Sequence, residues 1–261
     1  MFNPLIELIQ DTYGTAEFIP LHAPVFTGNE EEYVAQTIRS TFVSSVGGFV
    51  DRFEGDMAKY TGAERGVAMV NGTAALHLSL LAVGVQSGDL VITQSLTFVA
   101  SCNAISYCGA TPVFVDVDRE RLSLSPVALA AWLEKNAEHM PDGTCRTRAD
   151  QRPIRAVLPM HTFGHPADMV AICEVCEKWG LSVVEDAAEA LGSFSGDQHM
   201  GTFGDCGALS FNGNKLITTG GGGMILTNAE RGTRIKHLST TAKRPHAYEY
   251  EHDETGYNYR L

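Results

Sequence analysis

The chain has 261 residues, of which 44% are hydrophobic and 19% charged, a composition typical of a globular protein with a large core. Its formal net charge of −12 argues against nucleic acid or an anionic membrane as the main partner. The N-terminus lacks a basic start and a small-residue cleavage site, and no apolar window makes a good membrane span. We therefore expect a cytoplasmic protein.

The opening segment, residues 1–30, mixes proline and polar residues with short apolar pieces, and we expect an arm that crosses the surface. Residues 31–40 and 49–60 carry apolar side chains at helical spacing and predict two helices. Everything from residue 31 to residue 261 is predicted to form one large domain.

From residue 66 onward, strand-length apolar runs alternate with helical patterns. The predicted strands are 66–70, 90–93, 111–116, 154–159 and 182–185, and the predicted helices are 72–85, 97–108, 125–137 and 167–179. Residues 139–153 are predicted to be a polar loop, and two later strands, 208–211 and 223–227, are expected to pair with each other. The alternation predicts an α/β fold with a mostly parallel sheet covered by helices on both faces.

Polar residues follow three of the predicted strands at the point where each strand ends. They are the Asn71-Gly72-Thr73 stretch, His161 and Asp186. In open α/β sheets, ligands bind beyond the carboxyl ends of the strands. The sequence therefore predicts a ligand site at this edge of the sheet.

The Asn71-Gly72-Thr73 stretch begins a predicted helix, where free backbone N–H groups and the helix dipole favour a phosphate. The alternative is an ordinary capped helix. Phe98 stands at a similar boundary and could lie flat on a cofactor ring. The alternative for Phe98 is a core phenylalanine.

Asp186 and Lys215 suggest a cofactor with a cationic ring nitrogen and an aldehyde. A carboxylate keeps a pyridine nitrogen protonated, and a lysine amine condenses with an aldehyde, which is the chemistry of pyridoxal phosphate (PLP). Lys215 is the only Lys or Arg between Lys178 and Arg231. The alternatives are a helix cap for Asp186, with Glu189 completing a capping box, and a solvated surface position for Lys215.

The six scattered cysteines predict free thiols, and we expect no metal site. Cys173 and Cys176 form a lone C-x-x-C without a second ligand pair, so buried hydrophobic positions are the favoured interpretation. His161 and His165 are separated by Gly164, and Pro166 follows them, which breaks the helix that would present both rings together.

Five ordered motifs carry a resemblance that extends over nearly the whole chain: NGTAALHLSL, TFVASCNAI, VVEDAAEALGS, LSFNGNKLITTGGGGM and GYNYRL. They closely resemble the DegT/DnrJ/EryC1/StrS family of sugar aminotransferases, which are PLP enzymes of fold type I. The opening of the chain and HTFGHPADM look most like the branch that acts on nucleotide-linked 4-keto-6-deoxy-N-acetylhexosamines. Those enzymes serve surface glycans of the bacillosamine or legionaminic acid type.

The resemblance implies a role for each candidate residue. Lys215 is implied as the Schiff-base lysine, Asp186 as the pyridinium partner, Phe98 as the stacking residue, and Gly72, Thr73 and Ser210 as the phosphate ligands. Glu189 stands where the family usually has Gln or His beside the cofactor hydroxyl, and His161 falls near the substrate channel. Asn258 matches an asparagine that reaches the phosphate of the neighbouring subunit, which implies a homodimer with shared active sites.

The implied activity transfers the amino group of L-glutamate to the C4 ketone of a UDP- or GDP-linked sugar. Family members continue beyond GYNYRL into a small C-terminal domain, whereas this sequence stops inside that motif. Two alternatives remain open: a non-catalytic PLP-binding remnant, and a PLP-dependent sugar dehydratase. Dehydratases of this superfamily replace the lysine by histidine, and Lys215 argues against that class.

Overall fold

The computed structural model describes residues 2–20 and 22–261. Its helices are α1 (Asn3–Tyr13), α2 (Glu30–Ser40), α3 (Gly48–Thr61), α4 (Gly72–Ala82), α5 (Val99–Tyr107), α6 (Pro126–Asn136), α7 (Met169–Trp179), α8 (Ala229–Ser239) and the 3-10 turn η1 (Thr162–Gly164). Its strands are β1 (Arg65–Met69), β2 (Leu90–Gln94), β3 (Thr111–Val115), β4 (Ala137–His139), β5 (Cys145–Thr147), β6 (Pro153–Leu158), β7 (Ser182–Asp186), β8 (Phe194–Ser195), β9 (Gln198–His199), β10 (Cys206–Ser210) and β11 (Gly223–Thr227). No helix among these residues is long and apolar enough to cross a membrane.

The central sheet has the strand order β1-β11-β10-β7-β6-β2-β3. Neighbours from β10 to β3 run parallel, while β11 is antiparallel to both β1 and β10. The predicted mostly parallel sheet is thereby confirmed, and so is the pairing of the two late strands. Because the parallel strands share one direction, their carboxyl ends meet at the same edge.

The core lies in two layers, one on each face of the sheet. Helices α3, α6 and α7 pack on the face that receives Ala68 and Val183. Helices α4, α5 and α8 pack on the face that receives Val67 and Val184. Successive strand residues point to opposite faces. At the end of β7, this alternation sends Glu185 toward α7 and Asp186 toward α4 and α5.

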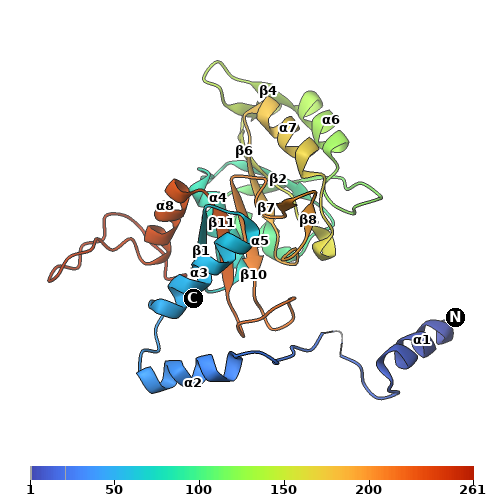
Figure 1. Cartoon of the computed structure of the whole chain (residues 1–261). Helices are drawn as coiled ribbons and strands as arrows, with labels where there is room; N and C mark the ends of the chain where they lie inside the picture. The colour runs from blue at the N-terminus through green and yellow to red at the C-terminus, as the bar shows by residue number, and fades with distance from the viewer. Residues whose placement is uncertain (1, 21) are drawn as a thin grey trace.

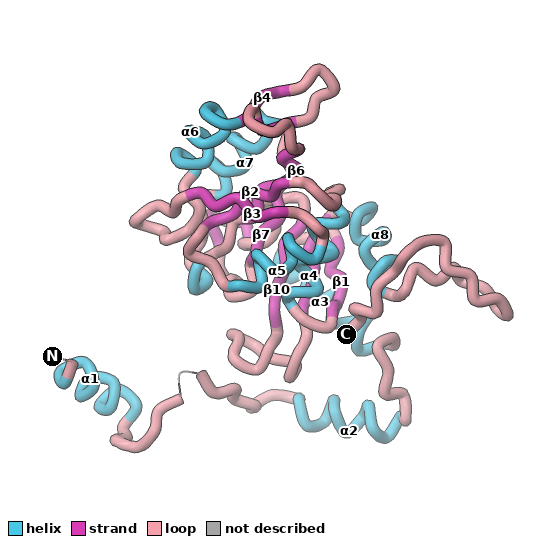
Figure 2. Tube along the Cα trace, turned by 180° about the vertical axis from the view of Figure 1, so that it is seen from behind, coloured by secondary structure: helices cyan, strands magenta, loops and turns pink. Residues whose placement is uncertain are grey.

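The N-terminal segment lies apart from this body, as Figures 1 and 2 show from opposite sides. Neither α1 nor α2 has a buried residue. The sequence predicted an arm here but not α1, whose Leu5, Ile6 and Ile9 are exposed. Tyr33 of α2 packs against Phe49 at the start of α3, with ring centroids 5.5 Å apart.

One prediction of local structure was wrong, and one helix of the main body was missed. Residues 139–153 are not one polar loop, because β4 and β5 form an antiparallel hairpin and β5 also pairs with β6. Each hairpin strand has only three residues, too few for a recognisable pattern. Helix α8 was not predicted either. Asn228 caps it by accepting a hydrogen bond from Arg231 N–H at 2.8 Å, and that asparagine was the available signal.

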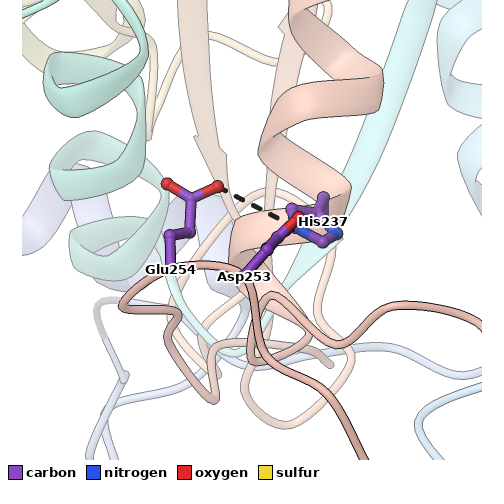
Figure 3. Close-up of side chains that lie close together, drawn as sticks. All are labelled: His237, Asp253 and Glu254. Carbon is purple, nitrogen blue, oxygen red and sulfur yellow. Dashed lines mark hydrogen bonds and ion pairs between the residues drawn. The ribbon is translucent and has the colours of Figure 1, made fainter.

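An ion-pair cluster attaches the C-terminal segment to α8 (Figure 3). His237 Nε2 lies 2.7 Å from Asp253 Oδ1 and 3.8 Å from Glu254 Oε1. Each carboxylate also has an arginine partner, Arg244 for Asp253 and Arg234 for Glu254. Since both negative charges are already compensated, this cluster is an ion-pair network of the fold.

Candidate active site

A cavity of about 420 Å³ lies at the carboxyl ends of β1, β2, β6, β7 and β10. Nine of the residues that the sequence singled out line it: Asn71, Gly72, Thr73, Phe98, His161, Asp186, Glu189, Ser210 and Lys215. Asn258 does not. It forms a bridge with Thr240 and accepts a hydrogen bond from Arg260 Nε at 3.0 Å. The predicted role of Asn258 concerns a neighbouring subunit and stays a prediction.

Asp186 is the last residue of β7 and is only 2% exposed. Its Oδ2 accepts a hydrogen bond from Ser101 Oγ at 2.5 Å, and its Oδ1 accepts one from Ala188 N–H at 3.2 Å. Burial raises the pKa of Asp186 above its ordinary value, and the Ser101 hydrogen bond is the largest influence that opposes this rise. A cationic ligand at this carboxylate would favour its ionised form.

Lys215 lies in the loop between β10 and β11, and its side chain is 16% exposed. Its backbone N–H donates to Asn212 O at 2.9 Å, which closes the turn that carries the amine to the cavity. The Nζ atom donates to Glu189 Oε1 at 3.0 Å. Lys215 is therefore not the solvated surface lysine of the alternative interpretation, and Glu189 is its ion-pair partner.

The N-terminus of α4 forms another wall of the cavity. Asn71 Oδ1 caps the helix by accepting from Ala74 N–H at 2.8 Å, so the capped-helix interpretation is confirmed. The first N–H groups of a helix have no partner inside it, so the start of α4 can bind an anionic ligand. A Cβ at Gly72 would lie 3.0 Å from Ser210 Cβ, so glycine permits the close approach of α4 to β10. The N–H groups at the start of α4 and the hydroxyls of Thr73 and Ser210 suit a phosphate.

Phe98 is 67% exposed and lines the cavity, so it is not the core phenylalanine that the sequence left open. It precedes α5 as the N-cap residue, and its backbone N–H lies 3.4 Å from the Met160 sulfur. An exposed ring on a rigid helix start is suited to offset stacking on a flat ligand.

His161 does not present its ring to a substrate. Its side chain is fully buried, and its Nδ1 accepts a hydrogen bond from Ala167 N–H at 3.2 Å. Its Nε2 therefore carries the proton and donates to Glu185 Oε2 at 3.1 Å. With both nitrogens engaged, the interpretation of His161 as a substrate-binding residue loses its geometric support.

The sequence did not single out Ser101 or Met160, which lie beside Asp186 and Phe98. Ser101 follows Thr97, which lies two residues before α5, by four residues, and the two hydroxyls lie 3.1 Å apart. That spacing was a usable signal, although nothing in the sequence alone connects Ser101 to Asp186 across 85 positions.

The donor set fits PLP. A buried carboxylate, an amine, an anion-binding helix start and an exposed aromatic ring line one cavity, whose volume lies within the usual range of about 300–1,000 Å³ for small-molecule sites. PLP offers a matching ring nitrogen, aldehyde, phosphate and flat heterocycle.

Residues 25–261 match the model of the DegT/DnrJ/EryC1/StrS aminotransferase family. GDP-perosamine synthase from Escherichia coli O157:H7 is 40% identical over 246 residues, which cover 94% of this chain and 63% of that protein. The aminotransferase from Psychrobacter cryohalolentis superposes with a TM-score of 0.80 at 32% identity, over 94% of this chain and 60% of that one. The PLP form of Spr1654 from Streptococcus pneumoniae does so with a TM-score of 0.80 at 26% identity, over 94% and 63%. The chain thus spans less than two thirds of the length of these relatives.

Proposed function

The chain belongs to the DegT/DnrJ/EryC1/StrS aminotransferase family, and from this premise we propose that it is a PLP-dependent sugar aminotransferase. The proposed reaction moves the amino group of L-glutamate to the C4 ketone of a nucleotide-linked sugar. The observation that carries the proposal is that Lys215 and Asp186 line one cavity although 29 positions separate them (215 − 186). We further propose that residues 31–261 form the cofactor-binding domain and residues 1–30 an arm.

When bound, PLP supplies an aldehyde that captures amines and a protonated ring that accepts electrons from the neighbouring carbon. Lys215 Nζ would hold the aldehyde carbon and then carry a proton from one carbon to the next, as base and then acid. For this, Nζ must leave Glu189, which is permitted because the Glu189 side chain is 43% exposed and water can take the place of the amine. Asp186 would keep the proton on the ring nitrogen, so that the ring stays electron-poor.

The other cavity residues would orient the cofactor. The N–H groups of Gly72 and Thr73 and the hydroxyls of Thr73 and Ser210 would bind the phosphate, which fixes one end of the ring. Phe98 would cover one ring face. Such fixed contacts orient the cofactor before the reaction, which reduces the loss of entropy on reaching the transition state.

For the sugar, the motifs favour a 4-keto-6-deoxy-N-acetylhexosamine, as used in surface glycans of the bacillosamine or legionaminic acid type. GDP-perosamine synthase is named for a GDP-linked sugar, so both UDP and GDP remain candidate nucleotides. We propose a homodimer in which Asn258 reaches the neighbouring site.

The test begins with the apo-protein, PLP and L-glutamate. We expect a visible absorbance band when PLP binds and its loss when glutamate is added, with release of 2-oxoglutarate. Lys215→Ala is the matched control and should show neither change. Single-turnover amination of UDP- and GDP-linked 4-keto sugars, followed by mass spectrometry, then identifies the acceptor. A protein that binds PLP but gives no glutamate response is a non-catalytic binding protein, which contradicts the proposal.

A further inference from the structure

Asp186 is held by two hydrogen bonds, one on each carboxylate oxygen, from helix α5 and from the turn that follows β7. Ser101 of α5 donates to Oδ2 at 2.5 Å, and Ala188 N–H donates to Oδ1 at 3.2 Å. Ser101 is fully buried, so water does not compete for its hydroxyl. The two donors together fix the rotation of the carboxylate about its side chain, because each oxygen is bound from a different direction.

A second hydroxyl sets the direction of the first. Thr97 lies two residues before α5, and its Oγ1 is 3.1 Å from Ser101 Oγ, nearer than its two other partners, the Met160 sulfur and Phe98 O, both at 3.4 Å. A serine hydroxyl has one proton to donate and lone pairs to accept. When Ser101 accepts from Thr97, its own proton points to Asp186, which forms a directed chain of two hydroxyls ending at the carboxylate.

A buried carboxylate needs such a donor, because burial favours its neutral form. The cationic or ionisable groups that face Asp186 are His161 and Lys215. His161 uses both ring nitrogens for other partners, and Lys215 Nζ is paired with Glu189. Ser101 is thus the side chain that directly stabilises the charge on Asp186.

We propose that Ser101 is a positioning residue, which keeps Asp186 ionised and aimed at the cofactor's ring nitrogen, and that Thr97 orients the Ser101 proton. The inference rests on the proposed function, since it names the residue that makes Asp186 fit for its role. Ser101 acts through Asp186 and need not touch the cofactor.

The test compares PLP with an analogue in which carbon replaces the ring nitrogen. Calorimetric titration of the apo-protein gives the affinity for each ligand, and their ratio measures the contact between Asp186 and the ring nitrogen. A hydrogen bond to a charged group is worth enough to change this ratio by about tenfold. We expect Ser101→Ala to lower the preference for PLP by roughly that factor while the analogue binds as before.

Two further variants keep the test decisive. Ser101→Thr retains the hydroxyl and should retain the preference. Thr97→Val removes only the orienting partner and should lower the preference by about threefold, the low end of a neutral hydrogen bond.

Each possible outcome bears on one claim. If Ser101→Ala weakens both ligands equally, Ser101 only packs against its neighbours and the inference is overturned. If the wild-type protein prefers PLP and Ser101→Ala prefers it as strongly, the inference fails while the proposed function stands. If the wild-type protein binds PLP no better than the analogue, or binds neither, the proposed role of Asp186 fails and the inference falls with it.

Discussion

The two faces of β7 carry adjacent carboxylates in opposite situations. On the α7 face, Glu185 is fully buried and accepts N–H donors from Gly201 at 2.8 Å and from Phe203 and Gly204 at 2.7 Å. It also receives the His161 ring at 3.1 Å. On the cavity face, Asp186 has only the Ser101 and Ala188 donors among the described residues.

This difference separates a carboxylate that holds the fold from one that is available to a ligand. A buried carboxylate with four donors has no lone pair left for a ligand. Its hydrogen bonds connect the turn after β9 to the segment after β6. A buried carboxylate with two donors on the wall of a cavity retains lone pairs for a cation. The sequence singled out Asp186 because it follows the predicted strand 182–185, and strand alternation and the count of partners now show how Glu185 differs from it.

The largest effect is expected at Lys215, on the cavity face. Lys215→Ala removes both the amine and the proton carrier, so we expect transamination to fall by at least about a thousandfold. The free energy of unfolding should change by no more than about 0.5 kcal/mol, because the ion pair with Glu189 is partly exposed. Turnover assays and urea denaturation measure the two quantities. A variant that aminates sugars at the native rate would contradict the assignment of Lys215.

The opposite result is expected for Glu185. Glu185→Ala leaves three N–H donors, of which that of Gly201 is buried, and the buried His161 ring without an acceptor, so the free energy of unfolding should fall by about 3 kcal/mol or more. Glu185→Gln keeps one acceptor oxygen and is the matched control with a smaller loss. Urea denaturation of the apo-protein gives both values. If Glu185→Ala is as stable as the wild-type protein, the distinction between the two faces of β7 is wrong.

The strand ends and the helix starts of this site could be predicted from the sequence. Asn71, His161 and Asp186 each follow an apolar run, and parallel strands bring such ends to one edge. The position of the Lys215 loop could also be predicted, because the two strands on either side of it were expected to pair. The contact between Ser101 and Asp186 could not be predicted, because it depends on how α5 packs on β7 and not on any local pattern.

The remaining differences between the predicted and the observed helices lie in the N-terminal and C-terminal parts of the chain. Helix α1 has apolar residues at helical spacing but no buried residue, so packing against the rest of the protein does not stabilise it. Helix α8 has few buried apolar positions, Ile235 and Leu238 among them, and its polar sequence hid it. Ion pairs (Figure 3) and backbone hydrogen bonds such as that from Tyr257 N–H to Leu238 O at 2.7 Å hold the C-terminal segment to α8, and neither leaves a periodic signal.

A pH-dependent effect is expected at Asp186. Because burial raises the pKa of this carboxyl in the folded apo-protein, the folded state binds its proton more tightly than the unfolded state does. Stability is therefore lost as pH rises through the folded pKa, when a buried charge must form. Asp186→Asn should match the wild-type protein at acid pH and exceed it at neutral pH, by about 2–4 °C in Tm for each kcal/mol. Thermal denaturation at a series of pH values tests this, and a variant that is less stable at neutral pH would contradict it.

The smallest effect is expected at Glu189, a third carboxylate only three positions after Asp186. Its side chain is 43% exposed, and its single ion pair, with Lys215, spans 3.0 Å. Exposed pairs of this kind contribute about 0–1 kcal/mol, so Glu189→Gln should change the free energy of unfolding by no more than about 0.5 kcal/mol. Glu185→Gln makes the same chemical change four residues earlier and should cost clearly more, since its site is buried. Equal losses in urea denaturation would mean that burial and partner number do not determine which of these carboxylates holds the fold.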